Sequence, residues 1–571
     1  MGQSTSVQQE QRSDEYTIDH GSLVSYFNEK CIKQFTKAEL LSFTNNIPEG
    51  KGLDDVVESS DISTLFHIPR DNTVLLSVFM NMFRTLANFP LIQESYDKVS
   101  FKTLLKSTLL LSKGRAAKYT EWKNFDELKM LFIALALEKS IKSESLPGSS
   151  SSSELRSSKA IIRSYNGVNV EELTINSNDL VHFFSFLLAL SRKSIMNNCQ
   201  IDDNTLSKSF ESFKQIAITF VRTMDPTIIS ASDSLKSYIT YEQFYDLIHN
   251  IAPNLISPLN MLLEHTLYMT RDLVDVDVLK PLENPSKIVT EPLLAQLATL
   301  FPKEIVFSRF QRLYVGRESG FSMRSFQSKV FKWMAPTILF IQGMRIRDED
   351  SEMEENYVAK NPRYRGFLEE FGKLKNEDQH LEELIIKKRK VLYAVYIRDP
   401  WKVSNKELFG DSNTKIIQLQ PTQEIYDAKP TSVGNVYFNT VGGGIGVGNQ
   451  QPNIKPSSKK YLPGNISLTI DSSLEFGIFR HVGDGGLFSP GRLSKVRGED
   501  RKSFEYRFLI QDVEVWGCGG EKELEEQVKL WQWEEMEAKR RQQINLQSMG
   551  EDRALLEMAG LVGQHQSGGS V

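Results

Sequence analysis

Hydrophobic positions along the chain change their period near residue 289. Before this point apolar residues recur at spacings of three and four, as Leu75, Phe79, Met82 and Leu86 do, and this spacing predicts amphipathic helices. After it, short apolar runs are separated by glycine-rich turns, which predicts β-strands. The pattern therefore predicts an α+β protein, in which a helical N-terminal region precedes a β-rich C-terminal domain.

Shifts in composition divide the chain further. At 571 residues it is too long for one core, because domains usually contain about 100–200 residues. In the C-terminal domain, strands are predicted at 337–342, 391–397, 415–419, 467–470 and 504–516. The predicted segments are a disordered tail (1–15), a helical region (16–143), a serine-rich linker (144–158), a second helical region (159–280), the β-rich domain (289–519) with a charged, solvated helical insertion (345–390), a C-terminal helix (521–546) and a disordered tail (547–571).

Two stretches of the helical half, 35–41 and 239–245, resemble the end of an EF-hand loop as it enters the exit helix. A calcium loop requires oxygen ligands at positions 1, 3 and 5, glycine at 6 and a bidentate glutamate at 12. In the first stretch Lys30 and Lys33 occupy positions 3 and 6, and in the second Gln243 occupies position 12. We therefore expect degenerate EF-hand-like structure that binds no calcium.

The C-terminal helix opens with glutamates and closes with lysine and arginine, the polarity that suits a helix dipole. Trp531 and Trp533 are two residues apart in it and so face different sides. We expect at least one of these rings to meet a domain or a partner.

Overall composition excludes several classes of protein. The net charge of −5 gives no general attraction for nucleic acid, which would need a basic face or stripe. No apolar stretch reaches the roughly 18–20 residues of a membrane span. The first residues show no basic segment followed by an apolar one, so we do not expect secretion. The three cysteines lie far apart, which predicts neither a disulfide framework nor a zinc site. These features indicate a globular protein of a reducing, cytoplasmic compartment that makes no direct contact with nucleic acid.

The N-terminus carries a lipidation pattern. Gly2 and Ser6 occupy the positions that N-myristoylation requires, the acyl chain joining the α-amine of Gly2. One myristoyl chain binds membranes only with a constant of about 10⁴ M⁻¹, so stable anchoring needs a second contact. Residues 3–15 contain no cysteine for palmitate and only one basic residue, Arg12. We therefore expect the second contact to be a protein on the membrane.

Candidate catalytic groups are few and unpaired. The glycine run from Gly442 to Gly448 lacks the lysine of a P-loop, so close backbone approach in a β domain is the favoured use of these glycines. His481 lies in a glycine-rich loop beside an acidic residue, and Cys518 has no basic neighbour to activate it. The sequence thus predicts no catalytic residue, cofactor or metal. An enzyme or redox effector using His481 or Cys518 is the weaker alternative.

Ordered aromatic and glycine motifs span the C-terminal domain. They begin with Leu313–Phe326, where Ser322 is predicted to cap a helix, and end with Phe508–Gly517. Between them come Trp401-Lys-Val-Ser404, Phe409-Gly410 and the glycine run. In these motifs the chain resembles the TLDc family, over about 289–519. The resemblance implies a compact β-sandwich flanked by helices, without established catalytic residues.

The resemblance also implies a function. Several TLDc proteins bind the vacuolar or lysosomal proton pump (V-ATPase) and resist oxidative stress, so we expect a non-enzymatic regulator on the cytosolic face of the vacuole membrane that favours pump disassembly. A cytosolic scaffold in a stress-response or telomere-capping pathway is the alternative. The candidate partner-binding residues are Trp401, Gly443, Trp516, Trp531 and Trp533.

Overall fold

The structure is a computed structural model. It describes residues 20–92, 99–112, 114–143, 158–192, 203–228, 236–267, 285–301, 310–346, 362–372, 374, 390–430, 434–456 and 458–518, together with ten residues between 525 and 541. The two predicted tails, almost all of the serine-rich linker and most of the charged insertion lie outside the described residues.

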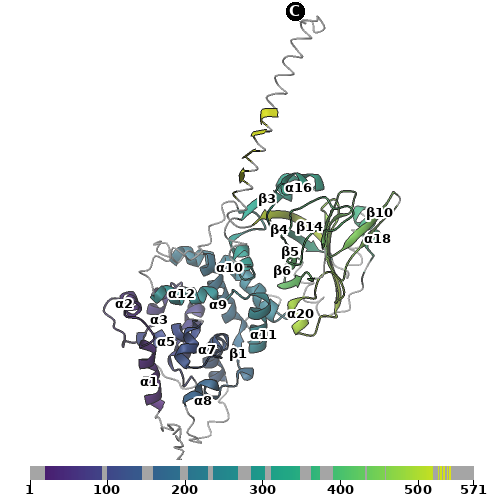
Figure 1. Cartoon of the computed structure of the whole chain (residues 1–571). Helices are drawn as coiled ribbons and strands as arrows, with labels where there is room; N and C mark the ends of the chain where they lie inside the picture. The colour runs from purple at the N-terminus through teal and green to yellow at the C-terminus, as the bar shows by residue number, and fades with distance from the viewer. Residues whose placement is uncertain are drawn as a thin grey trace, which may run out of the picture.

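Helices build the N-terminal half, as the three- and four-residue spacing predicts. They are α1 (His20–Ile32), α2 (Lys37–Asn46), α3 (Ser59–Leu65), α4 (Thr73–Ala87), α5 (Phe101–Leu111), α6 (Arg115–Thr120), α7 (Glu127–Ser143), α8 (Ser158–Arg163), η1 (Tyr165–Gly167), η2 (Val170–Glu172), α9 (Ser177–Arg192), α10 (Asp203–Met224), α11 (Tyr241–Asp246), its π-helical extension η3 (Leu247–Ile251), α12 (Ser257–Leu267) and α13 (Glu291–Ala298). The apolar stripe of α4 is buried in their common core. Figure 1 shows this helical region (purple to teal) beside the β-rich domain (green).

The EF-hand-like stretch at 35–41 is an ordinary helical hairpin. Only four residues separate α1 from α2, too few for a calcium loop. Thr36 caps α2 while the Glu39 side chain accepts a hydrogen bond from the Thr36 amide, so the pattern that suggested a loop end is a capping box. This stretch therefore lacks the full-length loop of a calcium-binding EF-hand.

The stretch at 239–245 keeps a loop-to-helix character. Strand β2 (Tyr238–Thr240) leads into α11, and it pairs antiparallel with β1 (Thr174–Asn176), which leads into α9. The Gln243 side-chain oxygen accepts a hydrogen bond from the Thr240 backbone amide, and the Gln243 backbone amide donates to the Thr240 hydroxyl. The residue at the last ligand position of a calcium loop thus serves as a helix cap.

Strands build the C-terminal domain, and all five predicted strands are present. They are β3 (Gln311–Val315), β4 (Thr337–Arg345), β5 (Lys390–Ile397), β6 (Lys415–Gln420), β7 (Glu424–Asp427), β8 (Val436–Asn439), β9 (Gly444–Val447), β10 (Gln450–Lys455), β11 (Ser458–Leu462), β12 (Ile466–Ile470), β13 (Phe476–Val482) and β14 (Ser503–Gly517). Short helices accompany them: α15 (Gly316–Ser319), α16 (Met323–Val330), α18 (Pro362–Phe371) and α20 (Arg492–Val496). The strands that periodicity misses are mostly four to seven residues long, too short for a clear alternation.

One antiparallel sheet folds over to make a β-sandwich. Its strand order is β7-β6-β5-β4-β14-β13-β12-β9-β8, with β3 added to β14, while β10 and β11 form a separate hairpin. The register of the 15-residue β14 shifts between Ile510 and Asp512, where a bulge bends the strand. Leu339 and Tyr393 on one half pack in the same buried cluster as Phe438 and Leu468 on the other.

The outer face of this sheet is covered by the helical region. Apolar side chains of β4, β5 and β6 belong to the same buried cluster as the cores of α4, α9 and α10. The ring of Phe301, after α13, lies 5.3 Å from that of Tyr396 on β5, measured between centroids. One apolar cluster is therefore shared by the helical region and the outer face of the sheet, while the interior of the sandwich forms a second cluster.

Candidate functional site

The Glu-Val-Trp-Gly motif at the end of β14 attaches the β-sandwich to the segment before α13. The Glu514 carboxylate accepts hydrogen bonds from the Ser286 hydroxyl at 2.6 Å, the Ile288 amide at 3.3 Å and the Trp516 indole at 2.9 Å. Burial raises the pKa of Glu514, although these bonds oppose the rise. The Trp516 ring stacks on Phe310 with centroids 4.9 Å apart. Trp516 is thus buried, which corrects its assignment as a surface contact for a partner.

Trp401 also lies in the core. Its indole nitrogen donates to the Thr337 hydroxyl at 2.9 Å, and its ring meets Phe326 edge-on at 4.9 Å. Phe326 belongs to α16, which Ser322 caps as predicted by accepting from the Ser325 amide. Trp401 therefore offers no exposed surface to a partner, and its aromatic ring fixes α16 to the sandwich instead.

The glycine run serves close packing within the sheet, as predicted. A Cβ on Gly444 would lie 2.1 Å from the Ile470 carbonyl oxygen, and one on Gly446 would lie 2.3 Å from the Tyr437 ring. Gly443 is buried too, and a Cβ there would meet Pro452 at 2.6 Å. Gly443 thus allows two segments to approach and presents no contact surface of its own.

His481 and Cys518 are both buried. His481 lies within β13, not in a loop, and its Nδ1 is 2.8 Å from the Lys502 carbonyl oxygen. Its ring stacks on Phe504, and burial lowers its pKa. The Cys518 sulfur lies 3.5 Å from the Pro336 carbonyl oxygen. Neither group is open to a substrate in this structure.

The polar contacts between the two regions centre on α20. The buried Glu424 carboxylate accepts from the Leu493 and Ser494 amides at the start of α20, and burial raises its pKa. Gly491 must lack a side chain, because a Cβ there would lie 2.5 Å from the Glu424 carboxylate. Glu424 thus caps α20 and holds it against β7.

Two arginines of this segment reach the helical region. Arg497 donates to the carbonyls of Thr223 at 2.9 Å and Met224 at 3.1 Å, where α10 ends. Arg492 is bidentate on Asp427 and also donates to the Asn250 carbonyl at 3.1 Å. Cations at helix C-termini satisfy carbonyls without an intrahelical partner and complement the helix dipole. The sequence shows two arginines five residues apart, but nothing in it indicates these partners.

Three polar contacts run in the same seam from the helical side. Arg222 donates to the Pro421 carbonyl at 3.0 Å, and the Thr223 hydroxyl accepts from the Gln423 amide at 2.8 Å. The buried Gln296 side chain donates to the Gln423 side-chain oxygen at 2.6 Å. The two regions are therefore joined by specific hydrogen bonds as well as by apolar packing.

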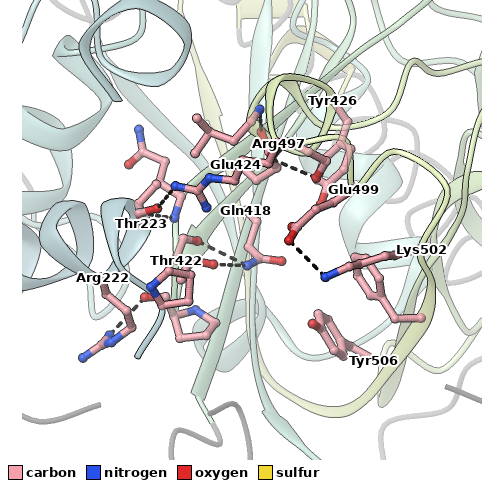
Figure 2. Close-up of a pocket in the computed structure, with 16 residues that line it drawn as sticks. Arg222, Thr223, Gln418, Thr422, Glu424, Tyr426, Arg497, Glu499, Lys502 and Tyr506 are labelled. Carbon is pink, nitrogen blue, oxygen red and sulfur yellow. Dashed lines mark hydrogen bonds and ion pairs between the residues drawn. The ribbon is translucent and has the colours of Figure 1, made fainter. Parts of the chain in front are cut away.

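A small cavity lies in this seam (Figure 2). Its volume is about 110 Å³, and its walls include Gln418, Tyr426 and the ion pair of Glu499 with Lys502 at 3.0 Å. Ligand pockets are usually about 300–1,000 Å³, whereas this space has room for a few water molecules. Within the described residues, no group of three His, Cys, Asp or Glu side chains is placed to hold a metal. The seam has the features of a structural joint and lacks those of a substrate site.

The remaining predicted site residues lie at the ends of the chain. Gly2 and Trp531 fall outside the described residues. Trp533 is described and 58% exposed, and Met536 is 64% exposed. The described residues from 525 to 541 are helical, and Figure 1 shows them (yellow) projecting from the β-rich domain. Among the described helices, none is long and apolar enough to cross a membrane.

Comparison with known proteins agrees with this architecture. Residues 282–519 match the family model described as the TLDc domain. Over the whole of both chains, the sequence is 69% identical to a protein of Kluyveromyces lactis, 48% identical to one of Lachancea thermotolerans and 47% identical to one of Saccharomyces cerevisiae strain S288c. The chain therefore belongs to the TLDc-domain family. Each of these three yeast relatives is named restriction of telomere capping protein 5.

Proposed function

We propose that this protein is a non-enzymatic regulator that binds the V-ATPase at the cytosolic face of the vacuole membrane and favours disassembly of the pump. The support is the TLDc resemblance together with the use of the motif residues in this structure. Trp401, Trp516 and Glu514 all maintain the fold, and His481 and Cys518 are buried. No group that the motifs supply is left for chemistry on a substrate.

The observation that carries a partner-binding role is the exposure of the C-terminal helical segment. Trp533 and Met536 are three residues apart, so they lie on the same side of a helix. Tryptophan is enriched among the residues that contribute most to protein–protein binding, and methionine adapts to varied apolar surfaces. We therefore assign the partner contact to this face.

Membrane attachment is the second part of the proposal. Myristoylation of Gly2 would supply one weak anchor, and contact with the pump would supply the other. On this model Gly2→Ala leaves the protein able to bind the pump in solution but reduces its share on vacuolar membranes. A Gly2→Ala protein that stays on membranes in full would show that the acyl chain is dispensable.

Two alternatives remain in view. The name of the yeast relatives favours a scaffold in a telomere-capping pathway, and a stress-response role would use the same binding surfaces. A redox effector would require His481 or Cys518 to meet a substrate, which their burial opposes.

The test is affinity purification of the tagged full chain from vacuolar membranes. Recovery of pump subunits is expected with the wild type and is expected to fall about tenfold or more for Trp533→Ala/Met536→Ala, because both side chains would lose their buried contact area. Tyr26→Ala/Leu41→Ala is the matched control, since it removes two exposed side chains from the helical region. Absence of pump subunits from the wild-type sample would refute the proposal. Equal recovery of pump subunits with both variants would show that Trp533 and Met536 do not form the contact.

A further inference from the structure

The Trp401–Ser404 motif holds two side chains outward at one end of the sandwich. Trp401 is buried, and the Ser404 hydroxyl accepts from the Phe438 amide at 2.8 Å. Lys402 and Val403, between these two anchors, are exposed, Val403 by 42%. The motif thus makes a rigid surface element, because both of its ends are bonded into the core.

The glycine-rich loop presents a second valine beside the first. Val441 is 61% exposed, and the Asn439 side chain accepts from its amide at 3.0 Å. The neighbouring Thr440 amide donates at 2.9 Å to Asn405, next to the Trp401–Ser404 motif. Two apolar side chains therefore stand out from adjoining, well-bonded loops.

Several lysines lie near these valines, together with the exposed Glu407, which follows Lys406. Lys406 lies on the same loop as Val403, and the hairpin β10–β11 is bonded to that loop through the Gln451 side chain, which donates to the Ser404 carbonyl at 2.6 Å. Residues 450–462 of the hairpin contain Lys455, Lys459 and Lys460 and no acidic residue. Lys459 is paired with Glu370 of α18 at 2.9 Å, so Lys455 and Lys460, which are exposed, carry the basic character of the hairpin.

The helix α16 extends the basic surface. Residues 320–336 contain Arg324, Lys329 and Lys332 and no acidic residue. The Phe331 ring, just after α16, meets Phe438 edge-on at 4.9 Å, which places this helix against the same end of the sandwich. The chain as a whole carries a net charge of −5, so this concentration of positive charge is local.

The chemistry of this surface matches lipid headgroups better than an acidic protein. Lysine is depleted at protein–protein interfaces, where arginine and aromatic residues are enriched. Clustered lysines, with their long apolar stems, favour anionic lipid. Each lysine near the surface raises the affinity of the protein for the membrane by roughly fivefold. Valines at loop tips can enter the headgroup region between such lysines.

We infer that the end of the sandwich formed by the Trp401–Ser404 motif, the glycine loop, α16 and the β10–β11 hairpin binds an anionic membrane surface through its lysines, with Val403 and Val441 entering the lipid. This contact would be a second membrane signal, carried by the β-sandwich and separate from the lipidation pattern at Gly2. The inference does not depend on the pump, so it can fail while the proposed function stands.

The experiment uses the unacylated full chain from bacteria and sedimentation with phosphatidylcholine vesicles, with and without phosphatidylserine. At about 0.1 M salt, where charges interact over about 10 Å, the wild type should bind only the vesicles that contain phosphatidylserine. Lys402→Glu/Lys406→Glu/Lys455→Glu/Lys460→Glu should weaken binding by roughly a hundredfold or more. Val403→Ser/Val441→Ser should weaken it several-fold while leaving its salt dependence unchanged.

The matched control reverses four exposed lysines of the helical region, Lys33→Glu/Lys37→Glu/Lys118→Glu/Lys123→Glu, and should bind as the wild type does. Equal weakening by the control would show nonspecific charge attraction and overturn the inference. The inference would also be overturned if the wild-type chain bound soluble poly-glutamate but not the anionic vesicles, because the surface would then be a protein-docking site. Circular dichroism of each variant separates loss of binding from loss of fold.

Discussion

Among the side chains of the TLDc motifs, Glu514 makes the most direct link between the β-sandwich and the segment before α13. Its carboxylate is fully buried and accepts from three donors, of which Ser286 and Ile288 belong to the segment before α13. Glu514→Ala removes all three acceptor contacts without changing the apolar packing of β14. The segment that carries Ile288 would then lose its polar attachment to the sandwich.

The expected cost follows from the donors left behind. Each buried donor without a partner costs about 1–3 kcal/mol. Removing a buried carboxylate also relieves the desolvation that raises the pKa of Glu514, which offsets part of the loss. We expect Glu514→Ala to lower the free energy of unfolding by about 3 kcal/mol. Glu514→Gln keeps an acceptor oxygen and should cost about 1 kcal/mol.

Urea denaturation followed by tryptophan fluorescence measures this difference. Trp516, one of six tryptophans in the chain, stacks on Phe310 and donates to Glu514, so part of the change in emission reports on this contact. Unfolding of the two regions is expected to be coupled, because they share the apolar cluster that covers the outer face of the sheet. A Glu514→Ala protein within about 0.5 kcal/mol of the wild type would refute the role assigned to the carboxylate.

Three further changes test other parts of the structure. Arg497→Met removes the cation from the end of α10 and should cost about 1–2 kcal/mol by denaturation, while the exposed Lys495→Met serves as a neutral control. Gly444→Ala should cost more than 2 kcal/mol, because its Cβ would overlap a carbonyl and its φ is +70°; unchanged thermal stability would contradict this. Burial lowers the pKa of Lys106 to about 7, so the unfolded chain binds this proton more tightly and stability rises with pH between 7 and 9. Lys106→Met should remove that slope, and an equal slope in both proteins would exclude this lysine as its source.

Periodicity predicts the long elements well and the short ones poorly. The stripe of Leu75, Phe79 and Met82 is the buried face of α4. Strands such as β4 and β5 carry continuous apolar runs because both of their faces are buried, one against the sandwich and the other against the helical region. The four-residue strands β8 and β9 contain too few positions for alternation, and glycine makes up half of β9.

Local chemistry misleads where two folds use the same residues. The sequence around Thr36 and Glu39 fits both an EF-hand exit and a capping box, and only the four-residue connection between α1 and α2 decides for the cap. The glycines that follow His481 predict a loop, yet pairing with Phe504 places His481 inside β13. Pairing between residues far apart in the chain cannot be predicted from the local sequence around either residue.

The sequence by itself determined the α+β class, the order of a helical region before a β-rich domain and the membership of the motifs in one domain. Each of these depends on spacing or residue type along the chain. Only the tertiary structure decided that Trp401 and Trp516 are buried, that α20 joins the two regions and that Val403 and Val441 stand together among lysines. These outcomes depend on contacts between residues far apart in sequence, which periodicity does not encode.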